Sequence, residues 1–441
     1  MHNLFGTDGI RTRVGTTPLT PSDMMQLGKA IALWISQKNT QGRIILGHDT
    51  RHSASLLKNA LKTGLLQFPI TIYDAQTIAT PALFYHTTQK EYDFGIMLTA
   101  SHNHYQDNGI KIFTKKNGKL TQEDEQTIMH FFYNEVPACS YEKIGTEIIK
   151  SDATDLYLDA LKIHFPSHFL KGIRLIIDCA NGSYAHKIPF FLESFGAQVT
   201  TLATTPDGKN INAHCGSLHP KHLQELVKSS GAHAGFAFDG DGDRLIAVGQ
   251  DGTCKDGDEI IGFLMNNPVY AQTPTVVGTV LSNQGLQDFV EKQGKFFYRT
   301  AVGDKLVIEK MKEVGALIGG EPSGHIILKD FSFTADGLFT LLQIAYTATL
   351  SQNWSLNSFT KLPQAHINMP TSCKKDLSLD PYQSIITYHR HQLKQGRLIV
   401  RYSGTEPLLR ISVEAPTYEE ALTIGTVLSE QLAEALTKES V

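Results

Sequence analysis

The same local pattern occurs three times in the chain, and it constrains the fold more than any other feature. In each case a short apolar run is followed by a polar or glycine-containing turn and then by apolar residues at helical spacing, in 43–67, 173–196 and 275–294. A continuous apolar strand followed by an amphipathic helix is typical of a parallel α/β unit. In the first segment the predicted buried helix face consists of Leu56, Leu57, Ala60, Leu61 and Leu65. The recurrence predicts three comparable α/β domains in tandem.

The C-terminal part of the chain follows a different pattern. Residues 396–413 are typical of a strand, a loop and a second strand, and 417–436 of a closing helix that begins at a threonine cap. The polar stretch 371–381 before them is typical of a linker or loop. We therefore expect domains at 1–148, 149–252, 253–362 and 363–441. A single large α/β domain remains the alternative.

Composition excludes several classes of partner. The chain has 40 Lys and Arg residues against 44 Asp and Glu, so its formal net charge of −4 gives no general reason to bind nucleic acid or an anionic membrane. Its five cysteines are scattered and form no CxxC pair, which argues against a disulfide framework or a thiolate zinc site. The N-terminus does not resemble a secretory signal, and no apolar run approaches the ~18 residues of a membrane span. We expect a cytoplasmic protein.

The loop 99–103 follows an apolar strand predicted at 94–98. Ser101 therefore lies at the carboxyl end of a strand, where α/β sheets usually bind ligands. Its hydroxyl can accept and donate a chemical group, with His102 and Asn103 as hydrogen-bonding neighbours. Lys111 follows closely enough in the sequence for the chain to bring it back to the site of Ser101. A simple Ser/Asn turn is the alternative.

The loop 239–244 reads DGDGDR and lies between two predicted strands, 234–238 and 245–248. Asp239, Asp241 and Asp243 alternate with glycines, which let the turn curl so that the three carboxylates face one point. Oxygen ligands alone favour a hard cation such as Mg²⁺. An EF-hand is excluded because its sixth and twelfth positions are Arg244 and Gln250 here, and because the flanks are strands. A solvated acidic turn remains the alternative.

The loop 319–325 reads GGEPSGH. Glycines flank a carboxylate, Glu321, and a hydroxyl, Ser323, and this combination suits the vicinal hydroxyls of a sugar. A tight turn with an incidental surface glutamate is the alternative. His325 is either a proton carrier, since its unperturbed pKa is near ~6.5, or a structural residue.

The loop 401–407 combines arginine, hydroxyls and exposed backbone amides. These groups form a cradle for an anion, best matched to a phosphate, and they are Arg401, Ser403, Gly404, Thr405 and, further on, Arg410. No Walker A sequence is present, so the phosphate need not belong to a nucleotide. An ion-paired loop is the alternative. The N-terminal loop 6–11 adds Arg11 as a possible further cation. A metal, a phosphate cradle and a serine together indicate phosphoryl transfer without an external nucleotide.

These motifs resemble those of the α-D-phosphohexomutase superfamily over essentially the whole chain. The motifs FGTDGIR, TASHN, DGDGDR, GEPSGH and RYSGTEPLLR occur in the family's order, at 5–11, 99–103, 239–244, 320–325 and 401–410. FGTDGIR and INAHCGSLHP, at 211–220, are most similar to the bacterial phosphoglucosamine mutases. The chain departs from the usual pattern at Pro322, Tyr402 and Lys305. These departures bear on sugar preference, so a phosphomannomutase or phosphoglucomutase with the same chemistry is the alternative function.

The resemblance implies a fold and a reaction. It implies four domains around a central cleft: three related α/β domains with mixed sheets and a smaller C-terminal α+β domain. It implies a phosphorylated Ser101 and one Mg²⁺ per chain, held by a phosphate oxygen and by Asp239, Asp241 and Asp243. The reaction would interconvert glucosamine 6-phosphate and glucosamine 1-phosphate through a hexosamine 1,6-bisphosphate, supplying UDP-N-acetylglucosamine for peptidoglycan precursors.

Roles for the remaining residues follow from the same resemblance. Lys111 is the preferred general base, which requires nearby cations to lower its pKa. The other predicted catalytic residues are Arg11, His102 and His325. The predicted substrate-binding residues are Arg244, Glu321, Ser323 and the phosphate loop. We expect a small phosphosugar as the partner and a monomer or homodimer as the assembly.

Overall fold

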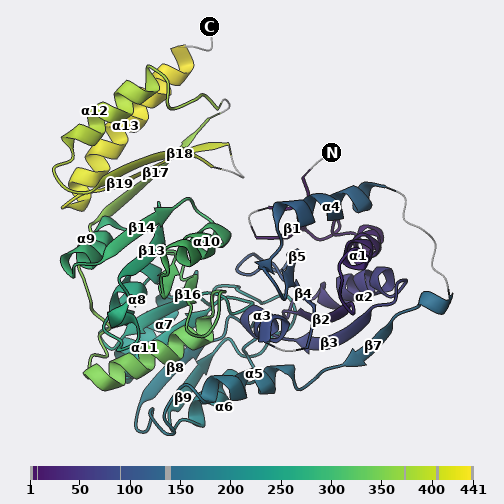
Figure 1. Cartoon of the computed structure of the whole chain (residues 1–441). Coiled ribbons are helices and arrows are strands. Elements are labelled where there is room, and N and C mark those ends of the chain that lie inside the picture. Colours follow the sequence, from purple (N-terminus) through teal and green to yellow (C-terminus); the bar gives the residue numbers. More distant parts are fainter. Residues whose placement is uncertain are drawn as a thin grey trace. The chain divides into compact units, whose positions relative to one another are not determined.

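The computed structural model describes residues 3–6, 8–89, 91–134, 141–371, 374–403 and 407–438 (Figure 1). The described residues form four separate sheets, so a single large α/β domain is excluded. The chain divides into two compact units. The first unit comprises Met1–Leu281 and Lys295–Ser358, and the second comprises Ser282–Gly294 and Phe359–Val441.

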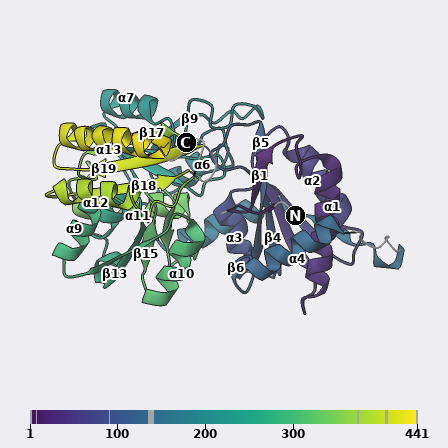
Figure 2. The same ribbon diagram turned by 90° about the horizontal axis from the view of Figure 1, so that it is seen from above.

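The first sheet is mixed and has the order β1-β5-β4-β2-β3-β7, with β6 paired to β5. Its strands are β1 (Ile10–Arg13), β2 (Arg43–His48), β3 (Thr71–Thr77), β4 (Phe94–Leu98), β5 (Asp107–Thr114), β6 (Gly118–Lys119) and β7 (Thr146–Ile149). The helices of this part are α1 (Pro21–Ser36), α2 (Ala54–Leu65), α3 (Thr80–Gln89) and α4 (Gln122–Tyr133). Figure 2 shows α1, α2 and α4 on one face of this sheet and α3 on the other.

The helix over 54–65 confirms the expected apolar stripe with one exception. Leu57, Leu61 and Leu65 are fully buried in the core, and Ala60 is partly buried against it. Leu56, however, is 55% exposed. The helix therefore presents a narrower face to the sheet than the sequence pattern indicated, because its neighbour Leu57 already points to the core.

Two further mixed sheets belong to the first unit. The second sheet has the order β12-β11-β10-β8-β9 and the third β14-β13-β15-β16. Their strands are β8 (Arg174–Asp178), β9 (Gln198–Leu202), β10 (Ala234–Phe238), β11 (Leu245–Gly249), β12 (Cys254–Lys255), β13 (Thr275–Thr279), β14 (Phe296–Thr300), β15 (Ile318–Gly320) and β16 (Ile326–Leu328). The helices are α5 (Ala153–Lys162), α6 (Ile188–Glu193), α7 (Lys221–Ser230), α8 (Gly257–Leu264), α10 (Asp304–Val314) and α11 (Gly337–Ser351), with short 3₁₀ turns at Tyr141–Lys143 and Tyr270–Gln272.

The second unit is built on a small antiparallel sheet of order β17-β19-β18. Its elements are β17 (Gln364–Pro370), β18 (Arg397–Tyr402), β19 (Leu408–Glu414), α9 (Gln284–Lys292), α12 (Tyr382–Gln392) and α13 (Tyr418–Lys438). Helices α12 and α13 cover one face of the sheet (Figure 1). Glu420 donates its backbone N–H to Thr417 Oγ1 at 3.2 Å, which is the expected threonine cap of α13.

The third predicted strand–helix segment is divided between the two units. Strand β13 belongs to the first unit, whereas α9, which follows it directly, belongs to the second. The backbone N–H of Gln284 at the start of α9 donates to Glu414 Oε2 of β19 at 2.7 Å. The strand and the helix are therefore where the sequence predicts them, but they do not form one packing unit. None of the described helices is long and apolar enough to cross a membrane.

Candidate active site

Ser101 lies in the turn between β4 and β5, as the sequence predicts. Its backbone φ is +52°, in the left-handed region that residues other than glycine rarely adopt. The Ser101 hydroxyl is buried and donates to Asp239 Oδ2 at 2.6 Å. His102 Nδ1 lies 3.3 Å from the same Oγ atom. A loop of the first sheet and a loop of the second sheet, far apart in sequence, thus meet at this hydroxyl.

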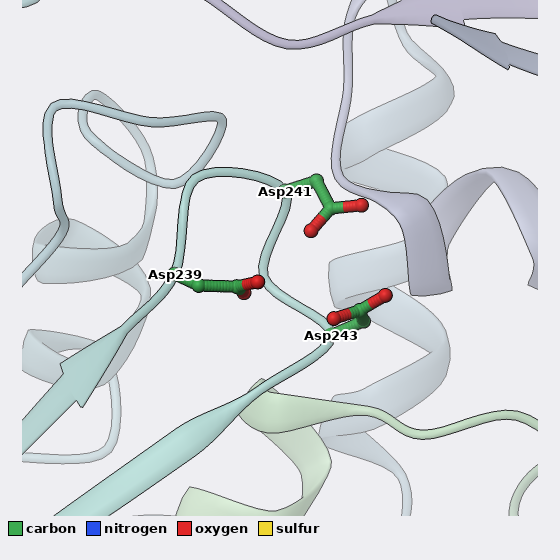
Figure 3. Close-up of side chains that lie close together, drawn as sticks. All are labelled: Asp239, Asp241 and Asp243. Carbon is green, nitrogen blue, oxygen red and sulfur yellow. The ribbon is translucent and has the colours of Figure 1, made fainter. Parts of the chain in front are cut away.

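The acidic loop joins the antiparallel strands β10 and β11. Asp239, Asp241 and Asp243 each offer an oxygen, and these oxygens lie within 4.8 Å of one another. Figure 3 shows the three carboxylates arranged around one space. Burial raises the pKa of Asp239 well above its usual value, and the charges of Asp243 and Asp241 raise it further. Three buried like charges this close are costly unless a cation offsets them.

The donor set fits a hard metal ion. Asp241 Oδ1 and Asp243 Oδ1 are buried and have no hydrogen-bond partner in the described part of the chain. Buried acceptors without partners are uncommon, and the carboxylates to which these two oxygens belong face the same space as Asp239 (Figure 3). All the ligand atoms are oxygens, which suits Mg²⁺ or Ca²⁺ better than zinc or copper. The group can therefore hold a metal ion.

Lys111, on β5, contacts the same carboxylates. Its Nζ lies 2.6 Å from Asp243 Oδ2, 3.0 Å from Asp241 Oδ2 and 3.1 Å from Asp8 Oδ2. Burial would lower the pKa of Lys111, but the charges of Asp241, Asp243 and Asp8 outweigh it and raise this pKa well above its usual value. A role as general base would require nearby cations to lower this pKa, whereas in the metal-free protein the carboxylates raise it. The charged lysine faces carboxylates.

His325 is also held between carboxylates. Its Nδ1 lies 3.7 Å from Asp243 Oδ1, and its Nε2 lies 3.4 Å from Asp304 Oδ2. Burial would lower the pKa of His325, but its interactions with Asp243 and Asp304 raise it to about 10. Lys119 in turn bonds to Asp304 and, at 2.6 Å, to Asp8 Oδ1. In the metal-free protein these two carboxylates therefore favour the protonated form of His325.

Three further predicted site residues lie near the acidic loop and Ser101: Arg11, His102 and Arg244. Arg11, on β1, donates from Nη2 to Asp8 Oδ2 at 2.8 Å. Arg244 Nε lies 4.0 Å from Asp243 Oδ1. Burial lowers the pKa of His102 to about 3, with the charges of Arg244 and Arg11 acting in the same direction. His102 is therefore neutral, whereas the residues around it carry full charges.

The loop with Glu321 and Ser323 is tied to the acidic loop through the backbone. Leu245, which directly follows Arg244, donates its N–H to Gly324 O at 3.0 Å. Glu321 Oε1 accepts the N–H of Gly303 at 3.2 Å, and Ser323 is exposed to solvent. The predicted sugar-binding groups are therefore anchored beside the predicted metal loop.

The predicted phosphate loop lies in the second unit. Arg401 on β18 stands directly opposite Arg410 on β19. Burial lowers the pKa of Arg401, and the charge of Arg410 lowers it further. Like charges directly opposite each other destabilise a sheet unless an anion offsets them, so the pair is suited to a phosphate. Ser403 is buried, and Lys374 Nζ donates to its carbonyl at 3.1 Å. Gly404 and Thr405 lie outside the described residues.

Comparison with family models covers almost the whole chain. Four models of phosphoglucomutase/phosphomannomutase match in order: α/β/α domain I at residues 2–137, domain II at 155–252, domain III at 256–365 and the C-terminal domain at 371–426. The chain belongs to this family. The predicted family is thereby confirmed, and so is the fold class of three related α/β domains followed by a smaller C-terminal domain.

Curated members of the phosphoglucomutase/phosphomannomutase family match at full length. The chain is 37% identical to the phosphoglucosamine mutase of Syntrophotalea carbinolica, over 98% of this chain and 97% of that protein. It is 38% identical to the phosphoglucosamine mutase of Syntrophus aciditrophicus, over 98% of this chain and 100% of that protein. These relatives confirm the prediction of an enzyme of the isomerase class that acts as a phosphotransferase.

Solved structures of the family share the fold. A phosphoglucomutase/phosphomannomutase family protein from Burkholderia thailandensis has a TM-score of 0.81 at 22% identity, covering 98% of both chains. The Aspergillus fumigatus N-acetylphosphoglucosamine mutase, solved with GlcNAc-6P and magnesium, has a TM-score of 0.65 at 16% identity, covering 98% of this chain and 96% of that chain.

Three residues of the site were not predicted from the sequence. Thr80, at the start of α3, donates from its hydroxyl to Asp241 Oδ2 at 2.6 Å and from its backbone to Asp241 O at 2.9 Å. Asp8 and Lys119 connect Lys111 with Asp304. Asp8 stands in the FGTDGIR motif and could have been selected there. Thr80 and Lys119 carry no local signal, because only the fold brings Thr80 to Asp241 and Lys119 to Asp8 and Asp304.

Proposed function

We propose that this chain interconverts glucosamine 6-phosphate and glucosamine 1-phosphate through a phosphorylated Ser101. The observation that carries the proposal is the Ser101 hydroxyl, 2.6 Å from Asp239 within a group of three buried carboxylates. The full-length relatives named phosphoglucosamine mutase support the choice of an amino sugar. A phosphomannomutase or phosphoglucomutase with the same chemistry is the alternative.

We propose that the acidic loop holds one Mg²⁺. Asp239, Asp241 and Asp243 would be its protein ligands, together with an oxygen of the phosphate on Ser101. A bound Mg²⁺ offsets the negative charge of a phosphoserine, which carries about −1.5 to −2, and so allows an anionic sugar phosphate to approach. The magnesium in the related Aspergillus fumigatus enzyme is consistent with this assignment.

The chemistry assigned to Ser101 is a transfer in two steps. In the first, the bond between phosphorus and Ser101 Oγ breaks, the C1 hydroxyl oxygen of glucosamine 6-phosphate bonds to phosphorus, and the C1 hydroxyl proton is passed to Ser101 Oγ. This step gives the 1,6-bisphosphate and the free serine hydroxyl. After the sugar has turned around, its 6-phosphoryl group returns to Ser101 Oγ, the serine proton is passed to the C6 oxygen, and glucosamine 1-phosphate remains.

The charged side chains have separate roles in this proposal. We keep Lys111 as the preferred general base, for which nearby cations such as the bound metal ion would have to lower its pKa. We assign His325 to offsetting the charge of the transferred phosphoryl group. Arg11 and Arg244 act in the same way, and neutral His102 is a hydrogen-bonding neighbour of Ser101 Oγ. Arg401, Ser403, Gly404, Thr405 and Arg410 bind the phosphate that is not transferred. Glu321 and Ser323 bind sugar hydroxyls.

Further parts of the proposal concern the whole protein. We keep the predicted domain limits of 1–148, 149–252, 253–362 and 363–441. We also propose that a hexosamine 1,6-bisphosphate primes Ser101, that the enzyme is a monomer or homodimer, and that it works in the cytoplasm in the supply of UDP-N-acetylglucosamine.

The decisive experiment compares substrates. The protein, primed with a hexose 1,6-bisphosphate in the presence of Mg²⁺, is assayed for kcat/KM on the 6-phosphates of glucosamine, glucose and mannose. We expect the highest kcat/KM for glucosamine 6-phosphate and an intact-mass increase of one phosphate, located on Ser101. A clear preference for mannose or glucose 6-phosphate would establish the alternative instead. A Ser101→Ala enzyme that turns over at the wild-type rate would refute the phosphoserine mechanism.

A further inference from the structure

Two side chains that the proposed mechanism does not use converge on the loop that carries Ser101. Arg51 follows β2, and its side chain is fully buried. Asn212 lies between β9 and α7, in the part of the chain that forms the second sheet. Both donate to the backbone carbonyl of Ser101, Arg51 from Nη2 at 3.0 Å and Asn212 from Nδ2 at 2.9 Å. The backbone of the nucleophile is thus held from two sheets.

All the N–H groups of the Arg51 guanidinium donate hydrogen bonds to Asp49 or to the loop that carries Ser101. Its Nε donates to Asp49 Oδ2 at 2.8 Å. Its Nη1 and Nη2 donate at 2.5–3.0 Å to four carbonyls of one loop, those of Ser101, Asn103, His104 and Asp107. A planar fork with five donors can serve several acceptors in fixed directions, which a lysine ammonium cannot do. The loop is therefore wrapped around a single buried cation.

Asp49 also helps to hold the backbone N–H of Ser101, in addition to the C=O that Arg51 holds. Its Oδ2 accepts the hydroxyl of Thr99 at 2.7 Å, besides Arg51 Nε. Thr99 Oγ1 in turn accepts the backbone N–H of Ser101 at 2.9 Å. The ion pair of Asp49 and Arg51 therefore fixes both the N–H and the C=O of Ser101, directly or through one hydroxyl.

The conformation of Ser101 requires such support. A φ of +52° is unfavourable for serine and persists only where the surroundings determine it. The 2.6 Å bond from Ser101 Oγ to Asp239 depends on this backbone direction. Asn212 itself has a φ of +57°, which asparagine tolerates better than most residues, and this places its amide between the carbonyls of Ser101 and Asn103.

We propose that Arg51 and Asn212 are positioning residues for the transferring serine. They hold the Ser101 backbone in the left-handed conformation that aims its Oγ at the acidic loop, and they touch neither the sugar nor the metal ligands. This inference rests on the proposed role of Ser101. Their loss should slow phosphoryl transfer and leave the binding of sugar phosphate nearly unchanged, because the predicted sugar-binding and phosphate-binding groups lie on other loops.

The test uses two variants and a matched control in the full-length, primed enzyme. Arg51→Lys keeps the charge beside Asp49 but cannot reach four carbonyls, and we expect kcat to fall about 100-fold, as for a misplacement of the reacting atom by about 1 Å. Asn212→Gly tolerates the positive φ and removes the side chain with its amide, and we expect kcat to fall about 10-fold. The control is Arg43→Lys, because Arg43 begins β2, the strand that Arg51 follows, and pairs with Asp93 at 3.5 Å.

The readouts separate positioning from folding. We measure KM, the melting temperature and the single-turnover rate of phosphoryl transfer from phosphorylated enzyme to sugar phosphate. Positioning requires a lower transfer rate in both variants, with KM within about threefold of the wild-type value and Arg43→Lys unaffected. If Arg51→Lys lowers the melting temperature, the transfer rate of Asn212→Gly alone tests the proposal.

Wild-type transfer by Asn212→Gly, or a raised KM with unchanged transfer in both variants, would overturn the inference while leaving the proposed function intact. Failure of the proposed function is distinguishable, since it would appear as an inactive wild type or an active Ser101→Ala enzyme.

Discussion

A buried carboxylate behind the acidic loop should make the stability of the protein depend on pH. Asp336 caps α11, where its Oδ1 accepts the N–H of Phe339 at 2.9 Å and its Oδ2 accepts the Tyr157 hydroxyl at 2.7 Å. The next residue, Gly337, donates its N–H to Gly242 O of the acidic loop at 3.1 Å. Burial raises the pKa of Asp336 from 3.8 to about 6. The Asp336→Asn variant removes this titration and keeps a side chain of similar shape.

The size of the effect follows from the pKa difference. A rise from 3.8 to about 6 is worth about 3 kcal/mol between the two protonation states, at ~1.4 kcal/mol per unit. Because the folded-state pKa of this acid is raised, its contribution to stability is fully present below pH 3.8 and is lost as the pH rises through about 6. Between pH 4.5 and 7.5 the free energy of unfolding of the wild type should therefore fall by about 2 kcal/mol relative to Asp336→Asn.

The assay is urea unfolding of both proteins at several pH values, followed by tryptophan fluorescence. The quantity compared is the difference in unfolding free energy between the variant and the wild type, because other titrating groups cancel in it. A Tyr157→Phe variant provides a second arm: the Tyr157 hydroxyl lowers the pKa of Asp336, so its removal should enlarge the fall of stability with pH. A difference that stays constant from pH 4.5 to 7.5 would refute the reasoning.

Three other predictions concern the acidic loop and the serine. Ser101→Ala should lose almost all turnover but still bind glucosamine 6-phosphate in calorimetry, because the sugar contacts lie elsewhere; loss of binding would contradict this. Mg²⁺ at 100 times its Kd should stabilise the wild type by about 2.7 kcal/mol in thermal unfolding, whereas Asp241→Asn should lose most of this gain; equal stabilisation of both would show that the metal binds elsewhere. Gly242→Ala should destabilise the protein by about 1–3 kcal/mol, because Gly242 has a φ of +77° and a Cβ would lie 2.3 Å from Tyr184 Cε2; an unchanged urea midpoint would contradict this.

The parts of the site that the sequence predicts are local in character. Ser101 and the acidic loop each follow a buried strand, so strand pattern and loop composition are sufficient to place them at sheet ends. Their meeting at 2.6 Å spans 138 residues and depends on how two sheets pack. The ordered set of motifs, through the family resemblance, provided that information. Asn212 and Thr80 likewise contact loops that lie more than 100 residues away in the sequence. Nothing in the sequence around either residue indicates these contacts, so residue patterns alone do not identify them.

The strand and helix within 275–294 illustrate a different limit. Both elements were expected, with Leu286, Phe289 and Val290 on the apolar face; Leu286 and Val290 are buried in α9, and Phe289 is half-buried. An amphipathic helix needs an apolar surface to cover, but its own sequence does not say which surface that is. Here the cap residue Asn283 receives the N–H of Leu362 at 3.0 Å, and α9 packs in the unit of the small antiparallel sheet. Proximity in the chain to β13 therefore does not determine which surface α9 covers.

The raised pKa of Lys111 in the metal-free protein has an electrostatic cause. A lysine near Arg11 and other basic motifs suggests a cationic neighbourhood, and cations lower the pKa of a lysine. What decides the pKa is the balance of charges in contact with Nζ, and here three carboxylates lie within 3.1 Å of it. In the apoprotein the ammonium offsets the charge that a metal ion would otherwise offset, and this keeps the acidic loop intact before metal binding. A site that must gather three carboxylates for a metal therefore benefits from a cation nearby.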